Sequence, residues 1–294
     1  MTSTAVRRKK RKDEIKVTVG PFRSQADYEA CEDIQQEAFD SRDIDVVPVP
    51  ILVAANRAGG ILLGAYSNLG DMIGFTFSIL GTRDGKPVQH CCLVAVRAAY
   101  KNFDVGYKLQ IALRKEALKR KITCVTCDFD PMQPLHSYFF LGKLGFRANI
   151  YEENLYGEAT DQLDRGLPTD RITATWDLEN SEVVKRLEDG PPRHDFRKEL
   201  KRVPAVNQLL ESAPGLFVSS PIKMDCDAEA FLFEVPYNIS EIKNRDLGAA
   251  MEWQRNLRQV FCGYFKKGYA AADFWATEQD GRLRAGYLLG KQKP

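Results

Sequence analysis

The sequence predicts a mixed α/β protein: a mostly antiparallel central sheet flanked by helices, followed by a smaller C-terminal α+β region. Three observations predict this fold class. Strand-like runs follow one another across short turns, and the hydrophobic period changes from two to 3.6 beyond residue 96. After Leu178 the sequence predicts short polar helices on either side of a linker. The chain has 294 residues, enough for one large domain or two small ones. We therefore expect a basic disordered tail over 1–13, a first domain over 14–178 and a C-terminal extension over 179–294.

The first domain is expected to begin with a strand, a helix and a series of antiparallel strands. Ser24 is a suitable N-cap for the helix, which ends near Phe39. The proline-rich stretch 45–50 is predicted to be extended rather than helical, because each proline biases the residue before it toward extended geometry. The expected strands cover residues 14–22, 61–66, 72–80 and 89–96.

The centre of the chain has the pattern of a parallel crossover. Apolar residues recur at helical spacing over 105–120, and strand 122–130 follows directly. A right-handed crossover through that helix places strands 89–96 and 122–130 side by side. A helix over 135–144, stopped by Gly145, and two strands near 147–151 and 172–178 complete the domain.

The C-terminal extension follows a linker over 188–193. Residues 246–266 form the most amphipathic helix of the chain, and we expect its apolar face to pack on the sheet or on a partner subunit. A homodimer is therefore left open. Around this helix the pattern predicts a strand at 231–236 and a hairpin of strands 269–277 and 283–289.

Composition excludes several classes of protein. Hydrophobic residues make up 44% of the chain, charged residues 28%, and the net charge is +2, so we expect neither a nucleic-acid partner nor a membrane partner. The cationic run 7–12 is interpreted as part of the solvated tail. No apolar run is long enough for a membrane helix or a signal core. Seven scattered cysteines are typical of reduced thiols, which favours a cytoplasmic protein.

No metal site is expected. Cys124 and Cys127 have the spacing of a metal or redox pair, but they lie in the predicted strand 122–130. Side chains three residues apart on a strand point to opposite faces, so these two thiols cannot share a metal ion. We interpret them as structural cysteines.

The junction between strand 89–96 and helix 105–120 carries the main functional signal. A tight loop that opens a helix presents backbone N–H groups beside the positive end of the helix dipole, which together favour an anion. Gly106 allows a phosphate to approach the backbone closely, and Lys101 adds a positive charge. On these residues alone, an ordinary strand-to-helix turn is the favoured interpretation.

Longer stretches of the sequence resemble the GNAT superfamily of acyltransferases, in particular a long-chain subfamily. The pyrophosphate loop of that superfamily reads Arg/Gln-x-x-Gly-x-Gly/Ala, and its three marked positions correspond here to Lys101, Asp104 and Gly106. The resemblance covers nearly the whole chain. It is carried by His90-x-x-Leu-x-Ala-Val96, Phe129-Asp130-Pro131, Lys143-Leu144-Gly145, Tyr151, Tyr156-Gly157, Gly166-Leu167-Pro168-x-Asp170-Arg171, Trp176, Asp246-x-x-x-Ala250-x-x-Trp253 and Gly268-Tyr269.

The resemblance implies a GNAT-like fold and an N-acyltransferase that uses acetyl-CoA or another acyl-CoA as co-substrate. In this superfamily the fourth strand diverges from the fifth, pantetheine binds in the gap, and an amine attacks the thioester directly. The acceptor would be a small-molecule amine. Because parts of the subfamily are associated with N-acylation of amino acids, the acceptor could be an amino acid. The cofactor-binding residues implied are Leu93, Val94, Val96, Lys101, Phe103, Asp104, Val105, Gly106, Tyr107 and Lys108.

The sequence departs from the family pattern at three positions, and the first two departures favour an alternative, a catalytically degenerate GNAT protein that acts as a CoA-binding or interaction module. Asp104 replaces the first loop glycine and brings a carboxylate toward a pyrophosphate. Leu141 replaces the usual tyrosine acid, and Tyr138, one helical turn earlier, is the substitute we expect, with core packing as a nearly equal alternative for its side chain. Cys92 replaces the second histidine of a His-x-His pair that begins at His90.

The remaining candidates are bases and substrate ligands. His90 can accept a proton near neutral pH, and Asp130 follows a central strand, where it could bind an amine or cap the next helix. His136 is a second candidate for the substrate cleft. Asp170-Arg171 is interpreted as an ion-pair or carboxylate-binding element, in which Arg171 could receive a carboxylate of the substrate. A plain surface role is expected more for Asp170 than for Arg171. A thiol-dependent enzyme that uses Cys92 with His90 lacks a third, orienting group in the sequence.

Overall fold

The computed structural model describes residues 16–39, 45–157, 166–192, 198, 202–279 and 282–292. The predicted basic tail therefore lies outside the described residues. The chain folds into two compact units: the described residues up to Thr126 form the first, and those from Cys127 onward form the second. The boundary falls inside strand β5 (Cys124–Phe129).

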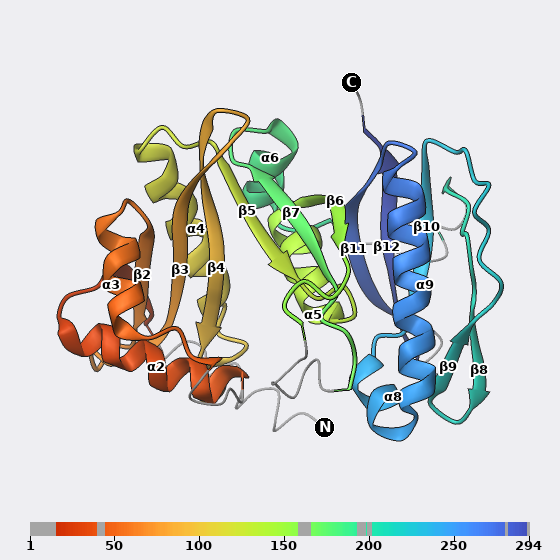
Figure 1. The fold of residues 1–294 in the computed structure, drawn as a ribbon, viewed down its shortest axis with the longest axis horizontal. Helices are drawn as coiled ribbons and strands as arrows, with labels where there is room; N and C mark the ends of the chain where they lie inside the picture. The colour runs from red at the N-terminus through yellow and green to blue at the C-terminus, as the bar shows by residue number, and fades with distance from the viewer. Residues whose placement is uncertain are drawn as a thin grey trace. The chain divides into compact units, whose positions relative to one another are not determined.

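The first unit is a mixed sheet with the strand order β1-β2-β3-β4-β5 (Figure 1). Its neighbours pair antiparallel except β4 and β5, which are parallel, as the predicted crossover requires. The elements are β1 (Thr18–Pro21), α2 (Gln25–Phe39), α3 (Val49–Arg57), β2 (Ile61–Tyr66), β3 (Met72–Arg83), β4 (Lys86–Val96), η2 (Ala98–Tyr100) and α4 (Val105–Lys119).

Helices cover both faces of this sheet. Figure 1 shows α2 and α3 on one side of β2–β4 and α4 on the other. The α2 and α3 side encloses a core cluster that excludes water and fixes the strand register. Its buried members are Cys31, Ile34, Leu52, Leu62, Tyr66, Met72, Phe75, Phe77 and Ala95. On α4 the buried apolar residues recur at the predicted helical spacing, at Val105, Leu109, Leu113 and Ala117.

The prediction for residues 45–50 is wrong at its end, because helix α3 begins at Val49. Pro48 is the N-cap residue and has extended backbone angles, whereas Pro50 lies within the first turn. Proline is tolerated there because the first N–H groups of a helix have no helical acceptor, and its fixed φ suits the helix. The same prolines therefore start a helix instead of excluding one.

In the second unit the strand order is β5-β7-β6-β11-β12-β10, and its paired strands β6/β7, β6/β11, β11/β12 and β10/β12 are antiparallel. The predicted fold class, mostly antiparallel sheet with flanking helices, is confirmed. The elements are α5 (Pro134–Ser137), η3 (Tyr138–Leu144), β6 (Arg147–Glu152), β7 (Arg171–Asp177), α6 (Ser181–Asp189), β8 (Leu209–Ala213), β9 (Leu216–Ser219), β10 (Ala230–Val235), α8 (Ile239–Arg245), α9 (Leu247–Phe265), β11 (Tyr269–Gln279) and β12 (Arg282–Lys291).

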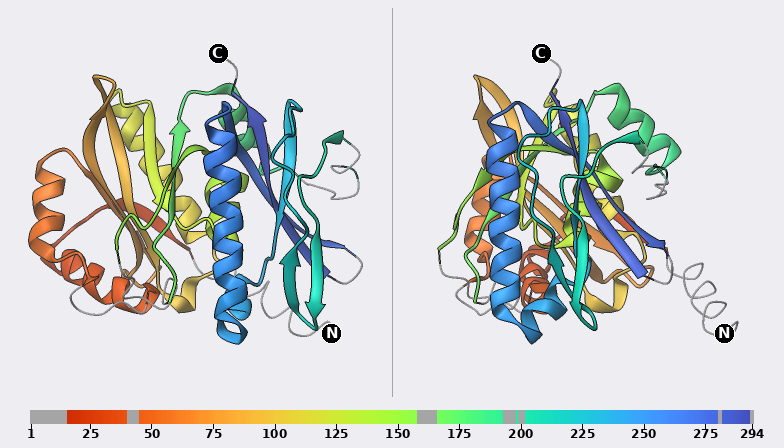
Figure 2. Two further views of the ribbon diagram at one scale, coloured as in Figure 1. Left: turned by 45° about the vertical axis from the view of Figure 1, so that its right-hand side comes forward. Right: turned by 90° about the vertical axis from the view of Figure 1, so that its right-hand side faces the viewer.

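The long helix α9 packs its apolar face on the sheet of its own unit, which confirms the first of the two expected positions. Figure 2 shows it lying along β10, β11 and β12. The Phe261 ring contacts the rings of Tyr151 on β6, Phe233 on β10 and Tyr287 on β12. Trp253 and Tyr264 of the same face are almost fully buried.

Residues 135–144 are not the single regular helix that the sequence predicts. A four-residue α-helix, α5, is followed by η3, a π-helix of seven residues. Gly145 ends it in the left-handed conformation, with φ of 82°, as predicted. A π-helix widens the turn by one residue per hydrogen bond, so the side chains of this segment are rotated relative to a regular helix.

Candidate functional site

Strand β4 is bent by a β-bulge at Cys92. On β3, Ser78 pairs with Cys91 and Phe77 pairs with Leu93, so Cys92 has no opposite residue in this ladder. The bulge reverses the alternation of side chains: the Cys91 sulfur contacts Gln110 of α4, whereas Leu93 packs on the α2 and α3 side. A bulge of this kind increases the local bend and twist of its strand.

The bulge lies where the pairing of β4 with β5 ends. This parallel ladder consists of two registered pairs, Gln89 with Val125 and His90 with Thr126, while β4 continues to Val96. Among the described residues, the ladder partners of 91–96 lie on β3 alone. The backbone of residues 93–96 therefore pairs with β3 on one side, and on the side of β5 it lies outside the ladder.

The turn after β4 ends in a left-handed backbone conformation. Asn102 has φ of 76°, and Asp104, the N-cap residue of α4, has φ of 57° and ψ of 22°. The tolerance of Asp104 for this conformation, which the sequence predicts, is confirmed. The Asp104 side chain makes no capping hydrogen bond to the helix.

The first turn of α4 presents backbone N–H groups to an anion. The first helical hydrogen bond joins the Lys108 N–H to the Asp104 carbonyl, 2.9 Å apart. The N–H groups of Val105, Gly106 and Tyr107 precede it and have no acceptor within the helix. Together with the dipole they form a partial positive charge, to which the exposed side chains of Lys101 and Lys108 add.

The Asp104 carboxylate opposes that positive charge. Burial, and after it the Asp104 charge, raises the pKa of the Tyr107 hydroxyl, so the carboxylate acts on the start of the helix. A pyrophosphate at this position would experience the same repulsion unless the Asp104 side chain turned away. The structure thus places the Asp104 carboxylate at the start of α4, where the departure from the family pattern leads us to expect it.

Glu37 of α2 braces the start of this turn, a role that no sequence pattern indicated. One carboxylate oxygen accepts the Ala98 N–H at 2.7 Å, and the other accepts Arg97 Nη1 at 2.8 Å. The Ala98 N–H and then the Arg97 guanidinium lower the pKa of Glu37. Arg97 Nε also donates to the Met72 carbonyl at 3.2 Å, which links the turn to the start of β3.

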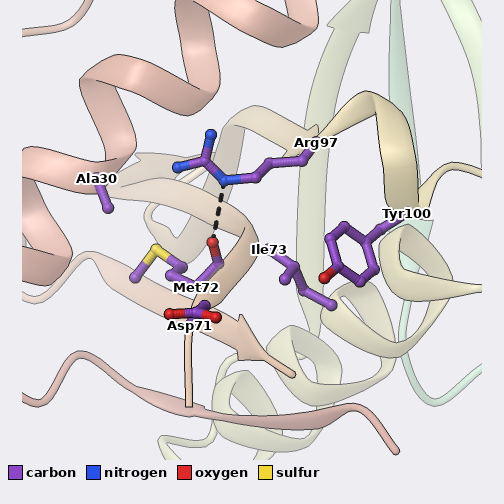
Figure 3. A pocket seen from close by; sticks show the side chains of 6 residues that line it. All are labelled: Ala30, Asp71, Met72, Ile73, Arg97 and Tyr100. Carbon is purple, nitrogen blue, oxygen red and sulfur yellow. Dashed lines mark hydrogen bonds between the residues drawn. The ribbon is translucent and has the colours of Figure 1, made fainter. Parts of the chain in front are cut away.

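A pocket of about 420 Å³ lies beside this brace, at the same end of β4 as the turn (Figure 3). Figure 3 shows Arg97 with its hydrogen bond to Met72 and the Tyr100 ring on the other side of Ile73. The pocket is lined by apolar and aromatic side chains together with one acidic and one basic residue. The lining residues are Ala30, Asp71, Met72, Ile73, Arg97 and Tyr100.

His90 is held on β4 by a neighbour on β5. Its Nδ1 lies 2.9 Å from the Thr126 hydroxyl, and Thr126 is buried. This bond fixes the orientation of the partly exposed imidazole ring, two residues before the bulge at Cys92. His90 therefore belongs to the same stretch of β4 as the predicted backbone contacts at 93–96.

The second unit holds the candidates Asp130, His136 and Tyr138 within nine residues of one another. The Asp130 side chain accepts the Met132 N–H at 2.7 Å, so it caps the turn after β5 rather than the helix. His136 lies in α5 and is partly buried. Tyr138 opens the π-helix with 37% of its surface exposed, whereas Leu141 is fully buried and has a packing role.

Asp170 forms an ion pair, which is one of the two roles expected of the Asp170-Arg171 element, and it does not have a plain surface role. Asp170 is 1% exposed, and Arg258 of α9 binds it with Nε at 3.1 Å and Nη2 at 2.9 Å. Asp170 also accepts the Tyr151 hydroxyl at 2.5 Å and the Asn154 N–H at 3.0 Å. The sequence offered no signal for Arg258, which lies 88 residues further along the chain.

Arg171, the expected carboxylate ligand, lies at the start of β7 beside this buried pair. Its Nη1 donates to the Asp170 carbonyl at 2.9 Å, and its guanidinium lies 5.3 Å from the centre of the exposed Tyr156 ring. The backbone of Arg171 is thus anchored by the Asp170 side chain next to it, while its own side chain remains partly exposed.

The described residues contain no group of three or more His, Cys, Asp or Glu side chains arranged to hold a metal ion. None of the seven cysteines, all of which lie in the described ranges, forms a disulfide. Of the helices that the structure describes, none combines the length and the apolar character needed to cross a membrane.

Comparisons with known proteins find similarity among solved structures. No family model matches the sequence, and no curated protein matches it. The ribosomal-protein-S18-alanine N-acetyltransferase of Escherichia coli shares 17% identity over 56% of this chain and 96% of its own, with a TM-score of 0.45. Arabidopsis thaliana Naa50, in complex with a bisubstrate analogue, shares 17% identity over 54% of this chain and 97% of its own, with a TM-score of 0.44.

A GNAT family acetyltransferase from Elizabethkingia anophelis, with acetyl-CoA bound, shares 18% identity with this chain. The alignment covers 56% of this chain and 99% of the acetyltransferase, with a TM-score of 0.41. In all three comparisons the similarity covers slightly more than half of this chain and nearly all of the other protein.

Proposed function

We propose that the protein is an acyl-CoA-dependent N-acyltransferase of the GNAT type that acts on a small-molecule amine. The observation that carries the proposal is the course of β4: it bends at Cys92, leaves its short ladder with β5, and is followed by a turn that opens α4, whose first N–H groups have no acceptor within the helix. A strand edge outside the ladder suits the amides of pantetheine, and a helix N-terminus suits a pyrophosphate.

The spacing of these two features fits one extended ligand. Residues 93–96 span about 10–13 Å of extended chain, and the turn and helix start follow directly. In this proposal the backbone of Leu93, Val94 and Val96 binds pantetheine, while Val105, Gly106 and Tyr107 bind the pyrophosphate through their N–H groups. Lys101 and Lys108 add charge, and Phe103 closes the turn against the Tyr100 ring.

The proposed reaction is a direct transfer of the acyl group. The amine nitrogen attacks the thioester carbonyl, a C–N bond forms, and the C–S bond breaks. A base, His90 or Asp130, takes the proton that the amine loses, and the thiolate leaving group takes a proton from the Tyr138 hydroxyl. Arg171 would bind a carboxylate of an amino-acid acceptor, and His136 would contribute to the same part of the site.

The direct test measures binding and turnover together. Acyl-CoA should raise the melting temperature in a concentration-dependent way. Release of free thiol should follow when amines, amino acids and peptide α-amines are offered with a panel of short acyl-CoAs. No thermal stabilisation by any acyl-CoA would contradict the proposed cofactor site.

A second candidate function is a CoA-binding or interaction module without turnover. The observations that favour it are the Asp104 carboxylate at the pyrophosphate turn and the buried Leu141 at the usual position of the acid. The same experiment separates the two candidates, because a module would be stabilised by acyl-CoA and release no thiol with any acceptor.

A further inference from the structure

Tyr287 of strand β12 is hydrogen-bonded to both ends of the turn that precedes Tyr138. Its hydroxyl donates to the Pro131 carbonyl at 2.5 Å and lies 2.6 Å from the Ser137 hydroxyl. Ser137 is itself fully buried, and it is the residue directly before Tyr138. Because the Tyr287 ring is fixed edge-on by Phe261 and Phe274, the position of its hydroxyl is fixed as well.

Arg186 of α6 supports the other end of the same segment. Its Nη1 donates to the carbonyl of Leu141 at 2.6 Å and to that of Gly142 at 2.9 Å. The last carbonyls of a helix have no donor within the helix, so the guanidinium satisfies groups that the π-helix leaves unpaired. Arg186 thereby fixes the C-terminal end of the π-helix.

Asp273 of β11 holds Arg186 in that position. Two hydrogen bonds join them, Nη2 to Oδ2 at 3.0 Å and Nη1 to Oδ1 at 3.2 Å. The side chains are 17% and 7% exposed, which makes this a largely buried bidentate pair. A lysine in place of Arg186 could not reproduce both the pair and the two carbonyl contacts.

The Tyr138 ring lies beside Gly142 of its own π-helix, close to strand β11. A side chain at Gly142 would place its Cβ 2.4 Å from the Phe274 carbonyl of β11 and 2.9 Å from the Tyr138 ring. The π-helix therefore lies against β11 with no space for a methyl group. Any displacement of the helix from β11 moves the Tyr138 ring.

We propose that Tyr287, Arg186 and Asp273 are positioning residues for Tyr138, and that the C-terminal extension serves to hold the segment 131–144 in its catalytic geometry. The inference rests on the proposed function, in which Tyr138 protonates the leaving thiolate. π-Helices are rare and occur frequently at functional sites. Here Arg186 bonds the π-helix itself, Tyr287 bonds the residues directly before it, and Asp273 holds Arg186. All three side chains lie beyond residue 179.

The test compares Tyr287→Phe and Arg186→Lys with a matched control, Arg284→Lys. Arg284 forms a similarly buried ion pair with Glu234, between β12 and β10 of the same extension. Because a small misplacement of a catalytic group costs up to about 100-fold in rate, we expect kcat to fall about ten-fold or more in the first two variants. The KM for acyl-CoA should change less than about two-fold in all three, since the proposed acyl-CoA contacts lie in the first unit.

A second readout does not depend on activity. Amide hydrogen exchange of residues 134–144 should become faster in Tyr287→Phe and Arg186→Lys and stay unchanged in Arg284→Lys. Unchanged exchange in this segment for both variants would overturn the inference, and so would an equal loss of kcat in the control. A wild-type protein that neither binds acyl-CoA nor releases thiol would refute the proposed function instead, and the exchange result would still judge whether the extension holds the segment.

Discussion

Asp104 combines two unfavourable features in one residue, a left-handed backbone and a negative charge at the start of α4. The first is a small strain that glycine would relieve, up to about 1 kcal/mol. The second opposes any phosphate that binds the N–H groups of the helix. The sequence could identify both features because the position of Asp104 in the loop pattern was visible without a structure.

Two substitutions of Asp104 separate charge from backbone strain. Asp104→Gly and Asp104→Asn both remove the carboxylate, but only glycine removes the strain. We expect both variants to bind acyl-CoA more tightly, by roughly three- to ten-fold for one screened unit charge, as measured by calorimetric titration. Unchanged affinity in both would mean that the carboxylate points away from the ligand.

Arg258, the partner of Asp170, is the residue-scale feature that the sequence did not predict. Asp170 is buried, so removal of Arg258 leaves its charge with two neutral donors alone, the Tyr151 hydroxyl and the Asn154 N–H. We expect Arg258→Met to lower the free energy of unfolding by about 2–3 kcal/mol, less than the roughly 3–5 kcal/mol lost when a fully buried pair is broken, because Arg258 is 31% exposed. Urea denaturation measures this change.

Arg255→Met is the matched control on the same helix. Arg255 pairs with Glu252, and both side chains are more than half exposed. Its replacement should therefore change the free energy of unfolding by less than about 0.5 kcal/mol. Equal losses in the two variants would contradict the special role of the Asp170 pair.

At the scale of elements, local patterns predicted most of the first unit. The strands, their turns and the helices α2 and α4 follow from alternation, glycine positions and helical spacing. The start of α3 was missed because Pro48 and Pro50 favour either an extended stretch or a helix N-terminus, and local sequence does not separate the two. The π-helix was missed because its extra residue per turn depends on the contacts of Gly142 and Arg186, which are not local.

The bulge at Cys92 permits an unusual test, because a deletion of Cys92 preserves the core. Cys91 and Leu93 already lie on opposite faces, so without Cys92 they alternate as in a regular strand. We expect the deletion variant to fold with a straight β4 and to lose at least about ten-fold in acyl-CoA affinity, since the bend that a bulge causes is gone.

Cys92→Ser is the control for the loss of the thiol and should bind acyl-CoA as the wild type does. Circular dichroism and thermal melting establish that both variants fold. Normal acyl-CoA binding by a folded deletion variant would show that the bend of β4 is not needed.

At the scale of the whole molecule, the pairings that build the second unit could not be predicted. Strands β6 and β11 are neighbours although more than 100 residues separate them, and no motif in either strand specifies the other. The same holds for Tyr287 and Ser137, which lie 150 residues apart. By contrast, β4 and β5 could be placed side by side because a short crossover has a fixed hand.

Several buried groups also determine how the stability of the molecule depends on pH. Burial raises the pKa of the hydroxyls of Tyr287 and Tyr151, the latter also through its bond to Asp170. A group with a raised pKa stabilises the fold fully below its unfolded pKa, about 10 for tyrosine, and loses that contribution as the pH rises toward its folded pKa. Burial likewise raises the pKa of the Cys91 thiol, whose effect begins near pH 8.5.

We therefore expect the free energy of unfolding to fall above pH of about 9, with each tyrosine contributing up to about 1.4 kcal/mol per pH unit above pH 10. Urea denaturation between pH 7 and pH 11 measures this slope. Tyr151→Phe should reduce the slope by the contribution of one tyrosine, up to about 1.4 kcal/mol per pH unit. A slope that is the same in the wild type and in this variant would contradict the assignment.

We propose that β4 and the N-terminus of α4 bind an acyl-CoA. Calorimetric titration of the protein with acetyl-CoA and, separately, with acetyl-pantetheine, which lacks the pyrophosphate, tests this binding site directly. We expect saturable binding of one acetyl-CoA per chain, with acetyl-pantetheine weaker by at least about ten-fold because the charged contacts at the helix start are lost. Equal affinity for the two ligands, or no binding of acetyl-CoA, would contradict it.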